Sequence, residues 1–544
     1  KLEINLMVDV LFAHQAHPIE PLGIGYLASS IARGGHTTRV ALTPKELDKA
    51  FDLVDREIQE KKPRIFAQSV IFGSHGYSIE LNKRVKARHP DIVTFLGGPA
   101  ATFTPELLER GFDAICRYEG EYPFLEFCDA LSAGLDVGNI PNIWVKENPA
   151  LFSTEVKKVK KNLDSRTRDY VHDTGYDPIR KRFVNDTRRL LEDGLLHDLP
   201  VPDRAPLYDR LVVADGKDPK VFADNPIKHF MHTRGCAFHC AYCHVEAQNL
   251  ENRGKGAPVR RRTNESVAQE VSDVMKRYGG GLVYFQDDIA GFAYTPDMAR
   301  EFAEVFGKLG WSSHAHVRFD LVSRDEKIAA DLARGGVTGV HIAIEAGNEE
   351  LRNKVHRRGM SDVQILRGAE YLRRHGIQMM SQNILGAPGE TRDQMVQTYE
   401  LNRVVRPTFA SASIFQPFPG TSELEYARDK GHLPPEMDQD RLIDTFGLDT
   451  FYRGSILALD PAQKRWLEVF HKFFAIGVDE DLPIDQLERR MAPYLTDSSR
   501  DSELEEMYRA HRHQKDEVLY GVKLGSRVEV PRLAGGLAGR AQAI

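Results

Sequence analysis

The chain has 544 residues, too many for one hydrophobic core, so its length predicts two or three domains. Apolar residues make up 41% of it, and 73 Lys and Arg against 79 Asp and Glu give a net charge of -6, which offers no electrostatic basis for a nucleic acid as the main partner. No apolar run reaches the ~20 residues of a transmembrane helix, and the N-terminus lacks a secretory-signal pattern, so we expect a soluble, cytoplasmic protein without a membrane span.

Strand-like and helix-like patterns alternate from the N-terminus to about residue 146. Short apolar runs rich in β-branched residues predict buried parallel strands at residues 4–12, 38–42, 65–70, 92–96 and 114–116. Helical patterns lie between and after them, at residues 22–33, 44–60, 77–88, 105–109 and 123–133. The alternation predicts a doubly wound, Rossmann-like α/β domain, in which ligands bind beyond the carboxyl ends of the strands.

The periodicity fades between residues 147 and 225, where charged residues crowd together. Two prolines, Pro200 and Pro202, argue against a helix or a central strand near the end of this stretch. We expect a connector that wraps the surface. Its Lys and Arg clusters are given no function, because such clusters are more often solvated faces than binding sites.

A second alternating series begins at about residue 226. Strands are predicted at residues 228–233, 282–286, 313–317, 339–344, 378–385 and 409–415, and helices at residues 265–277, 296–309, 326–334, 363–375 and 392–405. Six such repeats predict a partial (βα)6 barrel, with its active site at the carboxyl ends of the strands. The remainder, from about residue 435, is mainly helical, notably at residues 461–474, and ends in a small-residue tail that we expect to be disordered.

Three of the five cysteines, Cys236, Cys240 and Cys243, lie within eight residues directly after the first predicted barrel strand. Five cysteines are too few for a disulfide framework in so long a chain, so this clustering indicates metal or redox chemistry. A [4Fe–4S] cluster usually takes four Cys ligands, and three would leave one iron open to chelate a small molecule. The spacing therefore predicts a redox-active iron–sulfur cluster.

Two other interpretations of the cysteines stay open. Structural zinc could use the three thiolates with His239 or His244, although closed zinc sites usually pair two ligand knuckles, and the sequence holds no second pair. The cysteines could also be core residues that cluster by chance.

The spacing C-x₃-C-x₂-C, with the aromatic Tyr242 before the last cysteine, resembles the motif of the radical S-adenosylmethionine (SAM) enzymes. In that family the open iron of the [4Fe–4S] cluster binds SAM. An electron from the reduced cluster then cleaves SAM to a 5′-deoxyadenosyl radical.

The same resemblance implies SAM contacts further along the barrel. Glu345 lies in a segment that looks like the fourth-strand segment whose Glu contacts SAM. Gly386 and Pro388 lie in a segment that looks like the glycine-rich one near the adenine, and Arg318 follows the third strand, where the family often contacts the SAM carboxylate. Taken alone, Glu345 would be a surface carboxylate at a strand end, and only its place in this series favours SAM.

The chain departs from the family after the second barrel strand. The wider family often has Gly-Gly-Glu there, which holds the SAM amino group, whereas this chain has Asp287 and Asp288. An Asp could accept a hydrogen bond from an ammonium equally well. Which of the two does so stays open, and one could instead act as a catalytic base on the substrate.

Landmarks in the first domain extend the resemblance, over about residues 9–434, to the cobalamin-binding subgroup of radical SAM enzymes. A Gly-Gly-Pro turn needs no ligand when it stands alone, but here three landmarks occur in family order at predicted strand ends. Glycines would let the backbone approach a bulky cofactor, and a serine could hold its displaced nucleotide tail. The residues are Pro21, Leu22 and Gly23 at the first helix, Ser69 after the third strand, Gly97, Gly98 and Pro99 after the fourth, and Glu119, Gly120 and Glu121 after the fifth.

The D-x-H-x-x-G signature of His-ligated cobalamin proteins is absent from the sequence. The resemblance therefore implies base-off cobalamin without a protein His on cobalt. His14, His17 and His75 could still approach the cofactor.

The resemblance implies a methylase. One SAM would remethylate the cobalamin, and a second would supply the radical that removes hydrogen from an unactivated carbon, which then takes the methyl group. The substrate would be a small-molecule or lipid biosynthetic intermediate, and an electron donor such as flavodoxin or ferredoxin would reduce the cluster. The implied domains are a cobalamin-binding domain (residues 1–146), the connector (147–225), the radical SAM barrel (226–434) and a helical cap (435–544).

Three alternatives stay open. A cobalamin radical SAM enzyme can catalyse ring contraction, cyclisation or oxidation without methyl transfer. A methylthiotransferase would need more N-terminal cysteines than Cys116 and Cys128, which we expect in the core. A non-enzymatic cobalamin- or cluster-binding sensor would share the cofactors but form no 5′-deoxyadenosine.

Overall fold

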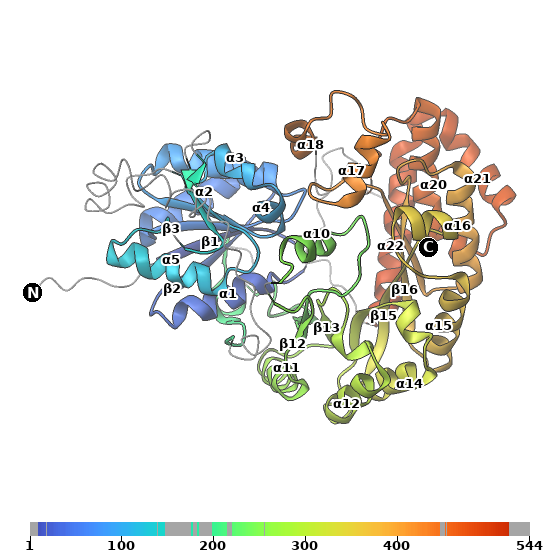
Figure 1. Ribbon diagram of the computed structural model, residues 1–544, viewed down its shortest axis with the longest axis horizontal. Coiled ribbons are helices and arrows are strands. Elements are labelled where there is room, and N and C mark those ends of the chain that lie inside the picture. The colour runs from blue at the N-terminus through green and yellow to red at the C-terminus, as the bar shows by residue number, and fades with distance from the viewer. Residues whose placement is uncertain are drawn as a thin grey trace, which may run out of the picture.

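The structure is a computed structural model that describes residues 9–17, 19–138, 140–146, 176–177, 182–183, 199–214, 220–254, 256–445, 452 and 454–521. Two sheets lie in separate lobes, with the helices of the C-terminal region beyond the second sheet (Figure 1). A short helix, α10 (His244–Glu251), lies between the two lobes.

The first sheet contains the parallel strands that the sequence predicts. They are β1 (Asp9–Gln15), β2 (Thr37–Thr43), β3 (Ile65–Ser69), β4 (Val93–Gly97) and β5 (Ala114–Cys116). Their order, β5-β4-β3-β1-β2, reverses direction next to β1, as in a doubly wound domain. Most of their residues are buried, which accounts for the apolar runs in the sequence. The Rossmann-like fold is therefore confirmed.

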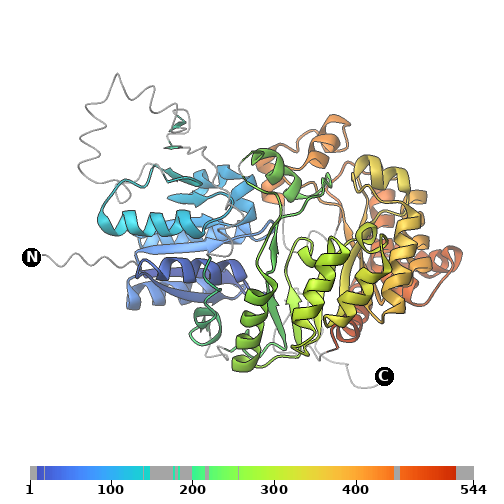
Figure 2. The same ribbon diagram turned by 60° about the horizontal axis from the view of Figure 1, so that its bottom comes forward.

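The helices of this lobe cover both faces of the sheet (Figure 2). They are α1 (Leu22–Ala32), α2 (Leu47–Lys61), α3 (His75–Arg88), α4 (Pro99–Phe103), the 3₁₀ turn η1 (Pro105–Arg110) and α5 (Glu121–Ala133). The sequence predicts a helix at residues 105–109, where the structure has only a 3₁₀ turn. It misses α4, whose five residues are too few for a visible period.

The sheet is also wider than predicted. On one side, β6 (Ile143–Lys146), β8 (Arg182–Phe183) and β7 (Tyr176–Asp177) add antiparallel strands, and on the other β9 (Val212–Val213) pairs parallel with β2. These strands have two to four residues, too short for an alternating pattern to show. Most of the predicted connector and the C-terminal tail lie outside the described residues.

The second sheet is fully parallel and has the six strands of the predicted partial barrel, in chain order. The strands are β10 (Ile227–Phe230), β13 (Leu282–Phe285), β14 (Ser313–Val317), β15 (Val337–Glu345), β16 (Gln378–Leu385) and β17 (Phe409–Ile414). A small antiparallel ladder of β11 (Thr233–Arg234) and β12 (Arg260–Arg261) flanks the segment that carries the three clustered cysteines.

Helices join the barrel strands and pack on the outside of the sheet (Figure 1). They are α11 (Asn264–Tyr278), α12 (Pro296–Phe306), α13 (Phe319–Val322), α14 (Glu326–Arg334), α15 (Asp362–Arg374) and α16 (Arg392–Val405). Capping boxes fix the starts of two of them, with Ser361 and Gln364 at α15 and Thr391 and Gln394 at α16.

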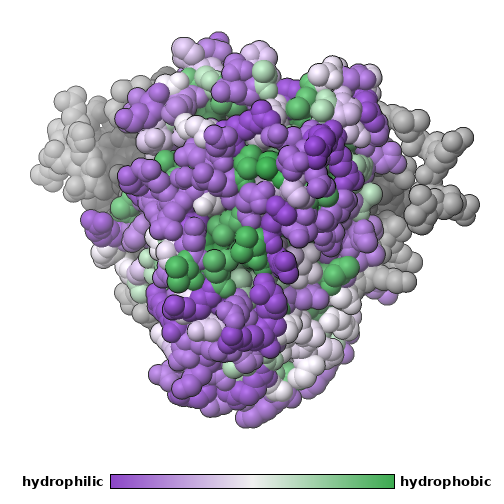
Figure 3. All heavy atoms as spheres, turned by 90° about the vertical axis from the view of Figure 1, so that its right-hand side faces the viewer, coloured by the Kyte–Doolittle hydropathy of each residue, from purple (hydrophilic) through white to green (hydrophobic). Residues whose placement is uncertain are grey.

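The C-terminal region contains α17 (Ser422–Asp429), α18 (Gln439–Thr445), α20 (Pro461–Asp479), α21 (Ile484–Thr496) and α22 (Asp501–Tyr520). Helix α20 packs on β17 and α16 and extends beyond the predicted residues 461–474. The outer face of this region is mostly hydrophilic, and the largest apolar patch in this view lies near its centre (Figure 3). Within the described ranges, every helix is too short or too polar to cross a bilayer.

Candidate functional site

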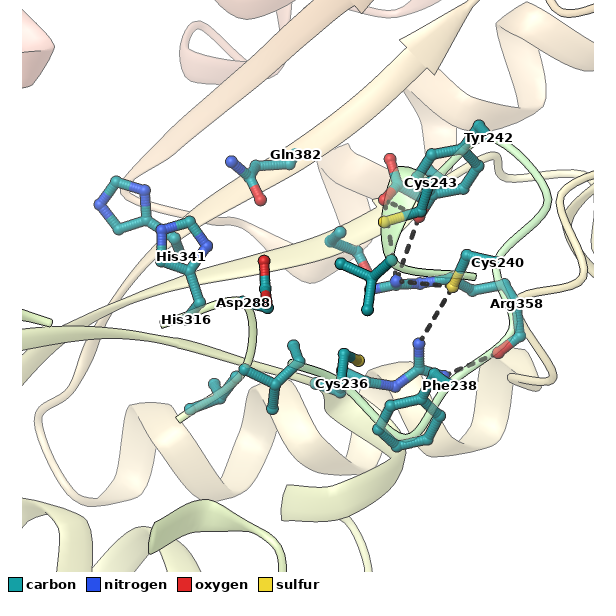
Figure 4. Close-up of a pocket in the computed structure, with 16 residues that line it drawn as sticks. Cys236, Phe238, Cys240, Tyr242, Cys243, Asp288, His316, His341, Arg358 and Gln382 are labelled. Atoms are coloured by element: carbon teal, nitrogen blue, oxygen red, sulfur yellow. Dashed lines mark hydrogen bonds and ion pairs between the residues drawn. The ribbon is translucent and has the colours of Figure 1, made fainter. Parts of the chain in front are cut away.

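A cavity of about 160 Å³ lies at the carboxyl ends of the barrel strands. All three clustered cysteines line it, together with residues of four strand ends. Figure 4 shows the cysteines on one side of this cavity and His316 and His341 on the other, with Asp288 between them. Of the predicted site residues, the cavity brings together Cys236, Cys240, Cys243, Tyr242, Asp288, Arg318 and Glu345.

The cysteine loop, residues 236–243, is held by hydrogen bonds of its backbone. Ala241 N–H donates to the His356 carbonyl at 2.9 Å, and the Asn249 amide donates to the Cys236 carbonyl at 2.8 Å. The loop starts after Gly235, whose φ is +83° and where a Cβ would meet the Pro258 carbonyl. Burial raises the pKa of the Cys243 thiol to about 12, so a metal that takes this ligand must displace its proton.

Two arginines point at the sulfur of Cys240. Arg318 Nη1 donates to Cys240 Sγ at 3.6 Å, and Arg358 Nη1 donates to it at 3.4 Å. Buried guanidinium groups in this position would balance the negative charge of sulfide and thiolate ligands. Three thiols around one cavity, with two cations behind them, fit an iron–sulfur cluster.

The alternative zinc site would need His239 or His244 as a further ligand. His244 is occupied elsewhere: its ring stacks on Phe72 and Phe103, with ring centres 4.7 Å and 4.5 Å apart. Its Nε2 also lies 3.2 Å from the Pro419 carbonyl. In the part of the chain that the structure describes, no three His, Cys, Asp or Glu side chains converge on one point for a single metal ion.

Tyr242, Glu345 and Arg358 form a cluster next to Cys240. Tyr242 Oη donates to Glu345 Oε1, and Arg358 Nη1 donates to Tyr242 Oη at 3.1 Å. Glu345 has a left-handed φ of +67°, uncommon for a residue other than glycine and more frequent at functional sites. Arg358 is absent from the sequence-based predictions. It follows no motif that the sequence analysis uses, and only the fold brings it to the cysteines.

Arg318 lines the cavity, but its guanidinium group is engaged by the protein. Nε donates to Asp320 Oδ1 at 2.8 Å, and Nη2 donates to the Arg358 carbonyl at 2.7 Å. The guanidinium also stacks over the ring of Phe238 at 3.6 Å. The predicted contact with the SAM carboxylate therefore stays a prediction, because this guanidinium already contacts Asp320, the Arg358 carbonyl and the cysteine loop.

The structure separates Asp287 from Asp288, which the sequence leaves equivalent. Asp287 Oδ1 accepts from the backbone N–H groups of His232 and Thr233 at 2.8 Å and 3.1 Å, away from the cavity lining. Asp288 faces the cavity, and its Oδ2 accepts from Gly235 N–H at 3.1 Å. Burial raises the pKa of Asp287 to about 7. Asp288 is thus the carboxylate placed to meet a ligand.

Gly386 and Pro388 are not among the residues that line the cavity. Gly386 has a φ of +75°, and its N–H donates to Glu390 Oε2 at 2.6 Å, which fixes the turn after β16. A Cβ at Gly386 would meet the Leu467 side chain of α20 at 2.6 Å. This turn therefore joins the barrel to the C-terminal helices.

Two histidines that the sequence analysis missed, His316 and His341, form the far wall of the cavity, and two tyrosines contact them from behind. Tyr284 Oη lies 2.8 Å from His316 Nε2 and 3.4 Å from His341 Nδ1, and Tyr520 Oη lies 3.4 Å from His341 Nε2. Burial lowers the pKa of His316 to about 4, so this wall is neutral at pH 7. No motif connects these residues, which come from three strands and α22.

The first lobe forms a glycine-lined edge where β4 ends. Gly98 has a φ of +93°, and a Cβ there would meet the Val70 carbonyl at 2.5 Å and Ser69 Oγ at 3.2 Å. A Cβ at Gly97 would have nothing within 4 Å, so this position faces open space. Pro99 then begins α4. The cradle fits a bulky cofactor such as cobalamin, with Gly97, Gly98 and Ser69 as the residues that would hold it.

The other predicted cobalamin residues occupy different places on this lobe. Pro21 caps α1, Leu22 is buried, and Gly23 is exposed with open space around it. Glu119 and Glu121, on either side of Gly120, form ion pairs with Arg234 and Arg260 of the second lobe.

The three histidines that could approach cobalt differ in their surroundings. His75 Nε2 lies 2.5 Å from the Ile443 carbonyl, and His17 Nδ1 accepts from Ile19 N–H at 3.1 Å. His14 follows the core of β1, and its Nε2 has no hydrogen-bond partner among the described residues. Base-off cobalamin without a His ligand stays a prediction, and His14 is the side chain on which to test it.

Two family models match the chain. The radical SAM superfamily matches residues 230–401, and the B12 binding domain matches residues 8–127. The first range contains the cysteine loop and the cavity, and the second contains the cradle after β4.

The chain is similar to several curated proteins. An uncharacterised methyltransferase of Pyrococcus horikoshii is 25% identical over 75% of this chain and 78% of its own length. The cytidylyl-2-hydroxyethylphosphonate methyltransferase of Streptomyces wedmorensis is 23% identical over 76% and 79%. The anaerobic magnesium-protoporphyrin IX monomethyl ester cyclase of Rubrivivax gelatinosus is 24% identical over 78% and 72%.

Two solved structures share the fold. The radical SAM methyltransferase TsrM from Kitasatospora setae aligns with a TM-score of 0.57 at 18% identity, over 79% of this chain and 76% of TsrM. The cobalamin-dependent radical SAM enzyme OxsB aligns with a TM-score of 0.62 at 13% identity, over 95% of this chain and 75% of OxsB. The chain thus contains a B12 binding domain followed by a radical SAM domain, and it shares its overall fold with TsrM and OxsB.

Proposed function

We propose that this protein transfers a methyl group to an unactivated carbon of a small-molecule or lipid biosynthetic intermediate. One observation carries the proposal: the three cysteines, Asp288 and Glu345 share one cavity in a chain whose first lobe is a B12 binding domain. Two of the relatives described above are methyltransferases, which favours methyl transfer over other radical chemistry.

When bound, the cluster, SAM and cobalamin supply the radical and the methyl carrier. Cys236, Cys240 and Cys243 would hold the cluster, and Asp288 and Glu345 would orient SAM through charge-assisted hydrogen bonds to its amino and ribose groups. Arg358 holds Tyr242 and Cys240 in place behind them. Gly97, Gly98 and Ser69 would admit cobalamin at the facing edge of the first lobe, and we expect it base-off.

The neutral wall of His316, His341 and Gln382 is the part of the cavity left for a substrate. Neutral imidazole and amide groups donate and accept hydrogen bonds without demanding a charged partner. This wall suits a polar but uncharged region of the substrate next to the reacting carbon. A flavodoxin or ferredoxin is the proposed electron donor.

A second candidate function is cyclisation or oxidation without methyl transfer. The magnesium-protoporphyrin IX monomethyl ester cyclase supports it, because this relative matches the chain over a similar length and with similar identity. A cofactor-binding sensor without catalysis is the non-enzymatic alternative. Methyl transfer and cyclisation or oxidation form different products, and a sensor forms none. One assay therefore separates the three candidates.

The test is an anaerobic assay of the reconstituted protein with SAM, cobalamin and a strong reductant. The probes are cytidylyl-2-hydroxyethylphosphonate and magnesium-protoporphyrin IX monomethyl ester, which appear in the names of two relatives described above. Mass spectrometry measures 5′-deoxyadenosine, S-adenosylhomocysteine and the mass of each probe. Cys243→Ala is the control, because it removes one cluster ligand.

Methyl transfer predicts that 5′-deoxyadenosine and S-adenosylhomocysteine form together. One probe should gain about 14 mass units, the mass of one added CH₂. Cys243→Ala should abolish all three signals. A probe consumed with 5′-deoxyadenosine but without a mass gain would favour cyclisation or oxidation. A protein that binds SAM and forms no 5′-deoxyadenosine with any probe would favour the sensor.

A further inference from the structure

Contacts with the first lobe hold both ends of the cysteine loop in place. Arg234 stands two residues before Cys236, and α10 begins at His244, directly after Cys243. Both flanks contact the same edge of the first sheet, where β4 and β5 end. The loop that would hold the cluster is therefore built into the boundary between the lobes.

The contacts before the loop are ion pairs. Arg234 Nη2 donates to Glu121 Oε1 at 2.5 Å, and its Nη1 donates to Glu119 Oε1 at 3.3 Å. Arg260, opposite Arg234 in the β11–β12 ladder, holds both oxygens of Glu119 at 2.7 Å and 2.8 Å. The ring of Tyr26 lies under the Arg234 guanidinium at 4.8 Å. These groups are largely buried, so replacing one partner would leave a charge without its counter-ion in a place that water hardly reaches.

The contacts after the loop combine another ion pair with ring stacking. Arg117 Nη2 donates to Glu251 Oε2, at the end of α10, at 3.1 Å. At the start of the same helix, the His244 ring is held between Phe72 and Phe103 of the first lobe. The helix that follows Cys243 is thus fixed at both of its ends.

Hydrogen bonds connect the first-lobe residues that hold the loop to the glycine cradle. Thr102 N–H donates to the Gly98 carbonyl at 3.1 Å. Arg117 Nε donates to the Thr102 carbonyl at 2.9 Å, and Tyr118 N–H donates to Thr102 Oγ1 at 2.9 Å. A change at Gly98 would therefore reach Arg117 and Glu119 through α4 within a few bonded contacts.

We propose that the glycine cradle and the cysteine loop form one coupled unit, in which Arg234 is a positioning residue and cobalamin and the cluster each strengthen the binding of the other. Binding of either cofactor orders one side of the shared boundary, and the ion pairs carry that order to the other side. By linkage, the factor must be the same in both directions. The inference needs only the two cofactors, so it stands or falls independently of methyl transfer.

The test compares the affinity for hydroxocobalamin of cluster-loaded and cluster-free full-length protein. Anaerobic titration followed by the visible absorption of the cobalamin gives the two Kd values. We expect the cluster-loaded protein to bind hydroxocobalamin at least about 5-fold more tightly than the cluster-free protein, which is the lower end of typical coupling between two sites. In Arg234→Gln the ratio of the two Kd values should fall to near one, even if both values rise.

A matched control separates coupling from general weakening of the boundary. Arg204 is also a buried arginine between the lobes, paired with Glu20 and Glu270, but it does not contact the cysteine loop. Arg204→Gln should leave the ratio unchanged. If Arg234→Gln fails to fold, Glu121→Gln removes one charge of the same ion pair and keeps a hydrogen-bond acceptor.

A second readout reports on the cluster itself. In the unaltered protein, added hydroxocobalamin should alter the EPR spectrum of the reduced cluster, and in Arg234→Gln or Glu121→Gln this response should be lost. A ratio of one in the unaltered protein would overturn the inference. So would a ratio that survives unchanged in both variants.

Discussion

Asp287 and Asp288 are neighbours in the chain with different environments, and this difference makes a prediction at the scale of one residue. Asp288 lines the cavity beside the cysteines. Replacing it by Asn removes the charge that would hold the SAM ammonium. Charge-assisted hydrogen bonds contribute about 1.5–3 kcal/mol, so SAM affinity should fall by about tenfold or more. Equilibrium binding of SAM to the cluster-loaded protein measures this.

Asp287→Asn is the matched comparison. Its Oδ1 accepts two backbone N–H groups, which an amide oxygen can also accept. We expect this variant to keep SAM affinity close to that of the unaltered protein. If Asp287→Asn weakens SAM binding and Asp288→Asn does not, the assignment of the two carboxylates is wrong.

Glu390 makes a prediction about pH. Burial raises its pKa from 4.5 to about 7, although Gly386 and Ala387 donate backbone hydrogen bonds to it. Between these values the folded protein keeps the proton and the unfolded chain releases it. Stability from this group is therefore present below pH 4.5 and is lost as the pH rises to about 7, by up to about 3 kcal/mol.

Glu390→Gln keeps the hydrogen-bond acceptor and cannot ionise. We expect the variant to lose this part of the pH dependence, so its free energy of unfolding should exceed that of the unaltered protein most at pH 7 and above. Urea denaturation at a series of pH values measures it. Glu425→Gln, at an exposed position on α17, is the control and should change the profile little. If the pH profile of Glu390→Gln ran parallel to that of the unaltered protein, the raised pKa of Glu390 would be contradicted.

At the scale of elements, the turn between β4 and α4 offers two adjacent glycines with opposite constraints. Gly98 has a φ of +93° and a ψ of 179°, a conformation open almost only to glycine. Gly98→Ala should lower the free energy of unfolding by about 1–3 kcal/mol or more, because the Cβ also meets the Val70 carbonyl.

Gly97→Ala tests the same turn without the strain. Its Cβ meets nothing within 4 Å, so stability should stay close to that of the unaltered protein. If this open space holds cobalamin, the methyl group should weaken cobalamin binding. Denaturation gives the free energy of unfolding of each variant, and titration gives the Kd of each variant for cobalamin. Tight cobalamin binding by Gly97→Ala would argue against Gly97 facing the cofactor.

The elements that the sequence predicts are those whose burial repeats along the chain. Strands such as β15 and β16 are long, mostly buried and rich in apolar residues, whereas β7, β8 and β9 have two residues each and leave no pattern. The same holds at the site. The cysteines form a local motif, but Arg358 and the histidine–tyrosine wall come together only through tertiary packing.

At the scale of the whole molecule, a second buried network of charges joins the two lobes. Arg204 donates to Glu20 of the first lobe and, at 2.9 Å, to Glu270 of α11. Glu270 also pairs with Arg262, and Tyr208 Oη donates to Glu20 Oε2 at 2.8 Å. The side chains of Arg204, Glu20 and Glu270 are each at most 5% exposed.

Such a network ties the stability of one lobe to that of the other. A buried charge whose partner is removed costs about 3–5 kcal/mol, so Arg204→Gln should destabilise the protein by this amount. Because Glu20 and Glu270 belong to different lobes, their repulsion also acts across the boundary. We expect one calorimetric transition in the unaltered protein. In Arg204→Gln we expect the lobes to unfold separately, with the first transition at a lower temperature.

Arg277→Gln is the control, since its pair with Asp209 is exposed and worth at most about 1 kcal/mol. A single transition at an unchanged temperature in Arg204→Gln would mean that the remaining contacts between the lobes, including the ion pairs of Arg234 and Arg260, hold them together without this network.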